Sequence, residues 1–297
     1  MRPLRSTGRR RALLALGALP FAAAATRAYG QQPYEPPPTT DGGPFVPTPW
    51  LILDEMLKLA EIRPDDTVYD LGSGDGRLVI AAAERHGARG VGVERHRDLV
   101  RHSRTQAERR GVADRVAFVE GDVLQADMRG ATVVLMYLLP RLVVQLVPKL
   151  RTELPVGARI VSHDYPLEPW KPDKTLLFEV EEKVAISGTA ETKLFFYVVP
   201  ARAGGRWALE IDAPVGDGRP IPLVIEQTPD RIEGTAQLDG RSTEVRVLRL
   251  RGDEIRFALL HRGRLLEFGG RVAGKTMSGE VEAHGTRGRW SARALPE

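Results

Sequence analysis

The fold of this chain is decided by residues 68–76, which read Val-Tyr-Asp-Leu-Gly-Ser-Gly-Asp-Gly. Apolar residues lead to an acid, Asp70, and a glycine-rich turn then opens a segment whose apolar residues have helical spacing. Glycine adopts positive φ angles without strain and lets the backbone approach a ligand closely. The stretch therefore predicts a buried strand, a tight ligand-binding turn and the first turn of a helix.

Strands and helices are expected to alternate on both sides of this turn. Thr48-Pro49 is a typical helix start, and apolar residues follow it at helical spacing. Such alternation predicts an α/β fold, a parallel sheet with helices on both faces. The expected helices are 49–60, 76–86, 97–110 and 141–150, and the expected strands are 68–71, 90–94, 116–119, 131–137 and 158–163. Two β-rich runs, 176–186 and 192–199, are expected to form an antiparallel hairpin that finishes the sheet.

The helical pattern ends after Pro200. Residues 206–294 contain short alternating runs, separated by turn signals such as Asp239-Gly240 and Arg262-Gly263. This pattern predicts a small antiparallel β-barrel or sandwich. The expected organisation is a leader over 1–30, a flexible linker over 31–44, an α/β domain over 45–200 and a β-domain over 201–297.

The formal net charge of +4 comes from the first thirty residues, which hold six of the 43 Lys and Arg residues and no acid. The rest of the chain is slightly acidic, so composition gives no support for a nucleic-acid partner. Three arginines at 9–11 precede an apolar stretch over 12–25, a pattern typical of a twin-arginine export signal. It predicts an exported, periplasmic protein. The alternatives are a cytoplasmic protein or one anchored at the inner membrane, with membrane association only through this leader.

The chain has no cysteine, which excludes disulfides, thiolate metal sites and cysteine nucleophiles. His261 and His284 have no partners at metal-ligand spacing, so no metal site is expected.

The glycines of the turn have the spacing G-x-G-x-G, whereas a dinucleotide-binding turn reads G-x-G-x-x-G. Two carboxylates accompany them and would repel a pyrophosphate. They are compatible with the cationic sulfonium and amino group of S-adenosylmethionine (SAM). Spacing and electrostatics therefore both favour SAM as the cofactor. The expected cofactor-binding residues of the turn are Asp70, Gly72, Ser73, Gly74, Asp75 and Gly76.

Two further acids follow the next two expected strands. Glu94 ends the second strand, where an acid accepts hydrogen bonds from both ribose hydroxyls of a nucleoside. Asp122 follows the third strand and is expected to bind the adenine amino group. Open α/β sheets bind ligands along the carboxyl edge of their strands, so Asp70, Glu94 and Asp122 predict one site.

With these residues, the chain resembles class I SAM-dependent methyltransferases. Two segments are also similar to the mitochondrial lysine methyltransferases that act on the adenine nucleotide translocase and on the ATP synthase c-subunit. They are 44–49, Pro-Phe-Val-Pro-Thr-Pro, and 149–162, Lys-Leu-Arg-Thr-Glu-Leu-Pro-Val-Gly-Ala-Arg-Ile-Val-Ser; Tyr165-Pro166-Leu167, Trp170 and Pro172 extend the similarity. The resemblance covers about residues 44–173. It implies a Rossmann-like, seven-stranded methyltransferase fold and a protein-lysine substrate, although that family lacks the C-terminal β-domain.

Methyl transfer to an amine requires a neutral nitrogen aligned with the S–CH₃ bond and shielded from water. The expected catalytic residues are Tyr137, which ends the fourth strand, and His163, which ends the fifth and would take a proton from the ammonium. A core aromatic and a buried structural histidine are the alternatives for these two. Aromatic faces attract a lysine head group. The expected substrate-binding residues are Pro47, Thr48, Asp164, Tyr165 and Trp170.

The sequence thus favours a SAM-dependent methyltransferase acting on a protein lysine, with a β-domain of unknown role. Two alternatives stay open: a small-molecule methyltransferase, and an exported protein that binds a nucleoside-like ligand without catalysis. The second follows from the expected export, because SAM is made in the cytoplasm.

Overall fold

The computed structural model describes residues 45–184 and 188–296. The expected leader and linker, 1–30 and 31–44, lie outside the described residues. Among the described residues, the helices are all too short or too polar to span a bilayer. The described chain forms two sheets, one ending at Val198 and the other beginning at Gly205.

The first sheet confirms the predicted methyltransferase-like α/β fold. Its strands are β1 (Thr67–Leu71), β2 (Arg89–Glu94), β3 (Val116–Glu120), β4 (Val133–Met136), β5 (Arg159–His163), β6 (Lys174–Glu179) and β7 (Glu191–Val198). They lie in the order β3-β2-β1-β4-β5-β7-β6, with β1 to β5 parallel and β7 antiparallel to both of its neighbours. The chain runs outward from β1 in both directions, so the switch point of the topology lies between β1 and β4. Sheets of this kind bind ligands at the switch point, outside the carboxyl ends of the strands.

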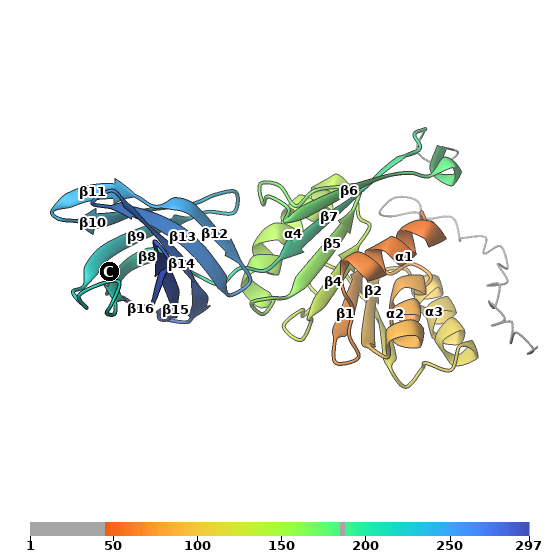
Figure 1. The fold of residues 1–297 in the computed structure, drawn as a ribbon. Coiled ribbons are helices and arrows are strands. Elements are labelled where there is room, and N and C mark those ends of the chain that lie inside the picture. The colour runs from red at the N-terminus through yellow and green to blue at the C-terminus, as the bar shows by residue number, and fades with distance from the viewer. Residues whose placement is uncertain (1–44, 185–187, 297) are drawn as a thin grey trace, which may run out of the picture. The chain divides into compact units, whose positions relative to one another are not determined.

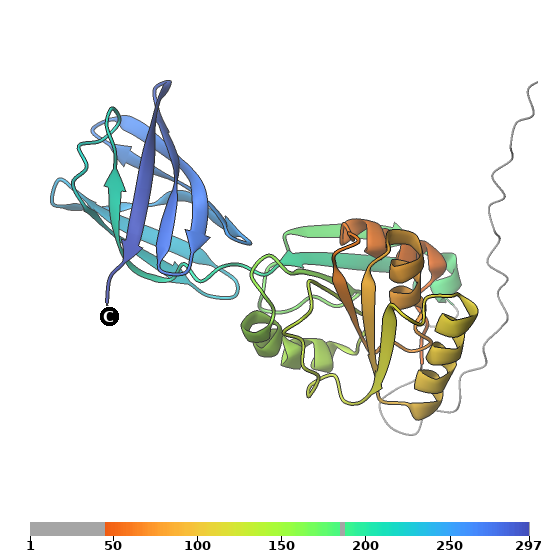
Figure 2. The same cartoon turned by 90° about the horizontal axis from the view of Figure 1, so that it is seen from below.

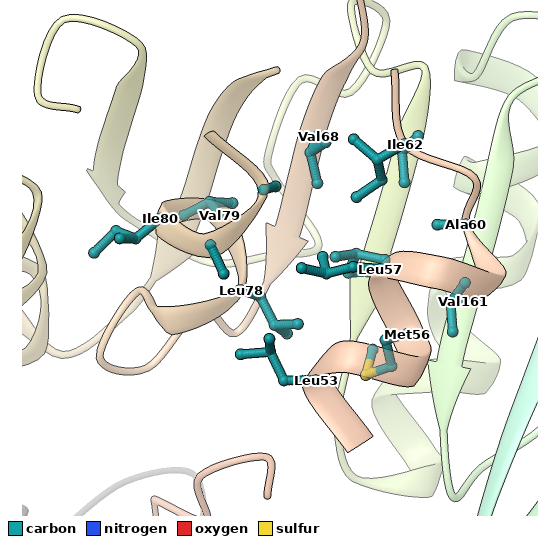
Figure 3. Packing of buried hydrophobic residues seen from close by; sticks show 14 of the residues in the cluster. Leu53, Met56, Leu57, Ala60, Ile62, Val68, Leu78, Val79, Ile80 and Val161 are labelled. Atoms are coloured by element: carbon teal, nitrogen blue, oxygen red, sulfur yellow. The ribbon is translucent and has the colours of Figure 1, made fainter. Parts of the chain in front are cut away.

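Helices cover both faces of this sheet (Figures 1 and 2). They are α1 (Trp50–Leu59), α2 (Arg77–His86), α3 (Arg97–Arg109) and α4 (Pro140–Glu153). The buried residues of α1, α2 and α3 share one apolar cluster with one face of the sheet, whereas those of α4 belong to a second cluster. In the first cluster Leu53 of α1 points toward Leu78 of α2, and Met56 lies near Val161 of β5 (Figure 3). Side chains of this size each contribute about 1.5–3 kcal/mol when fully buried.

The structure corrects the first arm of the expected hairpin. The strand predicted over 176–186 ends at Glu179, and a 3₁₀ turn, η1 (Glu181–Lys183), follows it. The last ladder bond runs from the amide of Val180 to the carbonyl of Ala190, at 2.8 Å. The chain then turns because the Lys183 side chain is buried and its Nζ lies 2.7 Å from Oδ2 of Asp164, an attraction that the β pattern does not reveal.

The second sheet confirms the predicted antiparallel β-domain and is a nearly closed barrel. Its strands are β8 (Gly205–Ile211), β9 (Ile221–Gln227), β10 (Ile232–Leu238), β11 (Arg241–Glu244), β12 (Arg246–Arg251), β13 (Glu254–His261), β14 (Arg264–Ala273), β15 (Thr276–Ala283) and β16 (Thr286–Ala294). The order is β11-β10-β9-β8-β16-β15-β14-β13-β12. The two outermost strands are joined by Val245 alone, whose amide donates to the carbonyl of Gly234 at 2.9 Å. The chain thus passes directly from β11 at one end of the sheet to β12 at the other.

An aromatic group fills the barrel. The rings of Phe257 and Phe268 stack with centroids 4.3 Å apart, and Trp290 meets both edge-on, at 5.4 and 5.8 Å. The indole N–H of Trp290 donates to the carbonyl of Gly269 at 3.1 Å, so its polar atom is satisfied inside the core.

Candidate active site

A cavity of about 360 Å³ opens at the carboxyl edge of β1, β2, β3 and β4, the place the topology predicts. Its volume lies in the range of small-molecule sites. It is also lined by the segment that precedes α1. Most of the residues expected from the sequence meet there: Pro47, Thr48, Asp70, Gly72, Ser73, Gly74, Asp75, Glu94, Asp122, Tyr137 and Tyr165. Gly76, His163, Asp164 and Trp170 are not part of the lining.

The glycine-rich turn after β1 forms the floor of the cavity. Gly72, Gly74 and Gly76 have φ angles of 79°, 52° and 80°, in the left-handed region. A Cβ on Gly72 would lie 2.6 Å from Cδ2 of Leu138, and one on Gly74 would lie 2.3 Å from Cε2 of Phe45. The turn therefore needs glycine both for its backbone conformation and for space.

Gly76 does not line the cavity and has a structural role in the turn. It is the N-cap residue of α2, and a Cβ there would lie 2.7 Å from the ring of Phe118 and 2.9 Å from Cβ of Ser103. The third glycine thus lets α2 pack closely against its neighbours. The sequence pattern did not separate this packing role from ligand binding.

Glu94 supports the turn from the end of β2. Its carboxylate accepts hydrogen bonds from the amide of Gly74 at 3.0 Å and from the amide of His96 at 2.9 Å. A carboxylate has about four acceptor positions, so two are left for the hydroxyls of a ribose. Glu94 is buried but lines the cavity, which fits the role expected from the sequence.

Asp70 is the most deeply buried acid of the cavity, with 2% of its surface exposed. Burial raises the pKa of Asp70 well above its usual range, and the nearby charges of Asp75 and Glu94 raise it further. A cation beside Asp70 would relieve both effects, because it favours the ionised carboxylate. The amino group and sulfonium of SAM supply such a charge, so this end of the cavity fits the cofactor.

Asp75 is paired with Arg77, a residue that was not predicted from the sequence. The guanidinium Nε lies 2.9 and 3.0 Å from the two carboxylate oxygens, and Nη1 donates to the carbonyl of Thr48 at 2.9 Å. Arg77 also lies over the ring of Trp50, 5.0 Å from its centroid. Arg77 therefore neutralises Asp75 and ties the segment before α1 to the cofactor turn.

Asp122 is exposed after β3 and lines the far end of the cavity. Its Oδ1 accepts the amide of Leu124 at 2.9 Å, which fixes the carboxylate at the start of the loop. The other oxygen is available for a donor such as an adenine amino group, in keeping with the prediction.

Tyr137 and Tyr165 line the opposite end of the cavity, after β4 and β5. Burial raises the pKa of Tyr137 above its usual range, and the charge and hydrogen bond of Asp164 add to the shift. The phenol is therefore neutral at any physiological pH. Tyr165 is fixed by its backbone, because its carbonyl accepts the hydroxyl of Ser162 at 2.6 Å.

His163 lies behind Tyr137 and not at the cavity. It has no exposed surface, and its ring packs on that of Tyr137 with centroids 3.9 Å apart. Burial lowers the pKa of His163 to about 4, with a further lowering from Lys183 against an opposing effect of Asp164. A buried, weakly basic imidazole is a poor proton acceptor for a lysine ammonium, so the structure argues against the expected role as a base.

The structure does not bring Trp170 to the site. Its ring packs against Tyr197, with centroids 5.3 Å apart, and belongs to the apolar cluster of α4. The turn formed by the amide of Trp170 and the carbonyl of Leu167, at 2.7 Å, directs the chain back toward that cluster. Trp170 is a core residue in this structure, buried and away from the cavity.

Comparisons with known proteins agree with this site. The family model of the ANTKMT methyltransferase domain matches residues 70–174. A protein-lysine N-methyltransferase of Saccharolobus islandicus (strain REY15A) is 37% identical over 157 residues, which cover 52% of this chain and 93% of that protein. An adenine nucleotide translocase lysine N-methyltransferase of Mus musculus is also 37% identical, over 43% of this chain and 56% of its own length.

A solved structure, that of an RNA methyltransferase from Salinibacter ruber in complex with S-adenosyl-L-homocysteine (SAH), has 44% sequence identity to this chain. The match covers 53% of this chain and 95% of that chain, with a TM-score of 0.48. The match to the archaeal protein spans nearly its whole length, whereas this chain spans only about half of the mouse enzyme. This chain belongs to the family of SAM-dependent methyltransferases defined by the ANTKMT methyltransferase domain.

Proposed function

We propose that this enzyme transfers the methyl group of SAM to the side-chain amine of a lysine in a protein substrate. One observation carries the proposal: a single cavity joins the acidic, glycine-floored end to an end lined by Tyr137 and Tyr165. The names of the archaeal and mouse relatives, which are lysine methyltransferases, support the choice of acceptor.

The acidic end would hold the cofactor. Asp70 offers a carboxylate to the cationic part of SAM, Glu94 two acceptor positions to the ribose, and Asp122 one to the adenine. When bound, SAM supplies an electrophilic methyl group on a positively charged sulfur. The protein needs only to place the acceptor nitrogen in line with that carbon and to exclude water.

The aromatic end would hold the amine. The neutral Tyr137 hydroxyl accepts an N–H of the amine and leaves the nitrogen lone pair free for the methyl carbon. Tyr165 also lines this end and would make a cation–π contact while the substrate is still an ammonium, whose proton passes to solvent before the transfer. Leu139 and Leu142, which follow Tyr137 in the chain, also line the cavity, and their apolar side chains would keep water from competing with the amine.

The test is incubation of the purified protein with tritiated-methyl SAM and an extract of host cells, followed by separation of protein and small molecules. Label in a protein band that yields methyl-lysine on hydrolysis supports the proposal. Label confined to small molecules rejects the lysine acceptor and keeps the methyltransferase. An Asp70→Asn variant is the control for cofactor-dependent label.

We also propose that the protein is exported. The arginines at 9–11 and the apolar stretch after them support this, as does the concentration of positive charge in residues 1–30. Cell fractionation of the wild type and of a variant with lysines at 9–11 tests the idea, since a twin-arginine signal requires arginine. Equal distribution of both proteins rejects export.

The domain limits at 45, 200 and 201 stay predictions.

A further inference from the structure

Asp164 lies at a strained position directly after β5. Its φ of 64° is left-handed, which is uncommon for a residue other than glycine. The amide of Tyr165 donates to the carbonyl of His163 at 2.9 Å and closes a turn around it. Strain of this kind costs of the order of a hydrogen bond and persists only where the surroundings hold the residue in place.

Strand β7 holds Asp164 from one side. The Asp164 amide donates to the carbonyl of Lys193 at 2.7 Å, and Oδ1 accepts the amide of Lys193 at 3.1 Å. These two bonds fix the backbone and one carboxylate oxygen. The second oxygen, Oδ2, is left to face the interior.

Lys183 of η1 takes that second oxygen. Its Nζ lies 2.7 Å from Asp164 Oδ2 and donates to the carbonyl of Glu191 at 2.6 Å. Lys183 is 5% exposed, so this is a buried ion pair. Buried lysines are rare unless paired, and breaking such a pair leaves an uncompensated charge.

The Asp164 carboxylate, held in this way, lies near Tyr137, which lines the cavity, and near His163, which lies behind Tyr137. The charge and hydrogen-bonding of Asp164 act on Tyr137 and raise its pKa, and the Tyr137 ring packs against that of His163 at an interplanar angle of 31°. The distance from His163 Nε2 to Asp164 Oδ2 is 3.7 Å, too long for a hydrogen bond. Neither ring nitrogen of His163 has a hydrogen-bond partner among residues 45–184 and 188–296. Tyr137 is thus held by its ring on one side and by its hydroxyl on the other.

We propose that Lys183 is a positioning residue for Tyr137, acting through Asp164. Because the ionised carboxylate takes the hydroxyl hydrogen of Tyr137, the phenol oxygen presents only lone pairs to the cavity. It then accepts an N–H from an amine and disfavours acceptors that lack a donor, such as a carboxylate. The inference rests on the proposed amine substrate, whose acceptor site it specifies further.

The charged and titratable groups around Asp164 fix the expected pH behaviour. They are Tyr137 beyond β4, His163 and Tyr165 beside it, Lys183 of η1, and the ion pair of Lys193 and Glu191 on β7, whose atoms are 2.6 Å apart. The charge of Lys183 lowers the pKa of His163, so loss of that charge should raise it. A residue that only filled space would leave that pKa unchanged.

The experiment compares Lys183→Gln, which keeps a hydrogen-bond donor without charge, with Lys183→Arg and with Lys174→Met. Lys174 is an exposed lysine on the neighbouring strand β6 and serves as the matched control. Three quantities are measured on the full chain: SAH affinity, the NMR titration of His163 assigned with His163→Gln, and the rate of methyl transfer.

Lys183→Gln should bind SAH within about threefold of the wild type and show a raised His163 pKa. Its kcat should fall by about 10- to 100-fold, the range for a slightly misplaced catalytic group, with the KM for SAM unchanged. Lys183→Arg should recover the His163 titration and part of the rate, and Lys174→Met should match the wild type throughout.

An unchanged rate with an unchanged His163 titration in Lys183→Gln would overturn the proposal. So would loss of SAH binding in that variant, because it would show a purely structural role. If the wild type labels no protein amine, the lysine substrate is rejected. The His163 titration and any transfer to small molecules then decide the role of Lys183 separately.

Discussion

Replacement of Asp70 by asparagine separates the stability of the protein from its cofactor affinity. The side chain keeps its shape and loses its charge. The pKa of Asp70 is raised in the folded protein, by burial first and then by Asp75 and Glu94, above the unfolded value of about 3.9. At a pH between these two pKa values, Asp70 is therefore protonated in the folded protein and ionised in the unfolded chain.

The sign of the effect follows from this difference. Binding of a proton to Asp70 stabilises the folded protein. This contribution is complete at a pH below the pKa that Asp70 has in the unfolded chain, and it is lost as the pH rises through the pKa that Asp70 has in the folded protein. Within that window the wild type loses about 1.4 kcal/mol per pH unit relative to Asp70→Asn, which has no proton to release. The variant should thus become the more stable protein as the pH rises toward neutrality, without its ligand.

Cofactor binding should change in the opposite direction. SAM brings a cation to the buried carboxylate, and loss of one partner of such a pair costs about 2–5 kcal/mol, or tens- to thousands-fold in Kd. Wild-type binding should also release a proton in the same pH window, which the variant cannot do.

Urea unfolding of both proteins from pH 5 to pH 8 measures the first effect, and calorimetry with SAM in buffers of different ionisation enthalpy measures the second. A stability difference that does not vary with pH would show that Asp70 is not a buried charge. SAM affinity in Asp70→Asn within threefold of the wild type would remove Asp70 from the cofactor site.

Three other changes test separate parts of the structure. Gly74→Ala should weaken SAH binding at least tenfold, because the new Cβ would lie 2.3 Å from Phe45. The control is Gly111→Ala, at a glycine with a similar positive φ and nothing within 4 Å, which should lower the free energy of unfolding by only about 1–2 kcal/mol. Equal SAH affinities of the two variants would contradict the steric argument. Tyr137→Phe should bind SAH normally and transfer methyl groups at least tenfold more slowly in the labelling assay, and an unchanged rate would exclude the hydroxyl from the reaction. Phe268→Ala removes a ring from the barrel core and should lower the free energy of unfolding by about 3–5 kcal/mol, measured by thermal unfolding. SAH affinity should be unchanged in calorimetry. A parallel loss of affinity would show that the two sheets do not act independently.

The parallel part of the fold could be predicted because each of its requirements leaves a local mark in the sequence. A buried strand, a positive-φ turn and a helix start are all visible within residues 68–76, and an acid at the end of a strand recurs at Glu94 and Asp122. The barrel was harder to predict, because close packing there requires glycine inside strands. A Cβ on Gly270 would lie 2.7 Å from the ring of Trp290, so β14 contains glycines at positions where glycine ordinarily weakens a strand.

The acceptor end of the site could be predicted only in part. Tyr137 was predicted from its position at the end of a strand, and Tyr165 from its aromatic face and the resemblance to the lysine methyltransferases; both line the cavity. Lys183 was hidden in a β-rich run, since its burial depends on Asp164, far away in the sequence. Trp170 had the right chemistry for a lysine head group, but no local signal showed that the chain turns it back against Tyr197.

The charges of the cavity explain why its acids select a cation. Asp75 is neutralised by Arg77, and Glu94 has two backbone amides on its carboxylate, so both have compensation within the protein. Asp70 is instead destabilised by those same neighbours. A buried charge of this kind is unfavourable for the fold, and the cost is offset only when a positive ligand arrives. A pyrophosphate would add two negative charges at the same place. The electrostatics of the folded site therefore give the same answer as the glycine spacing, by an argument that does not depend on it.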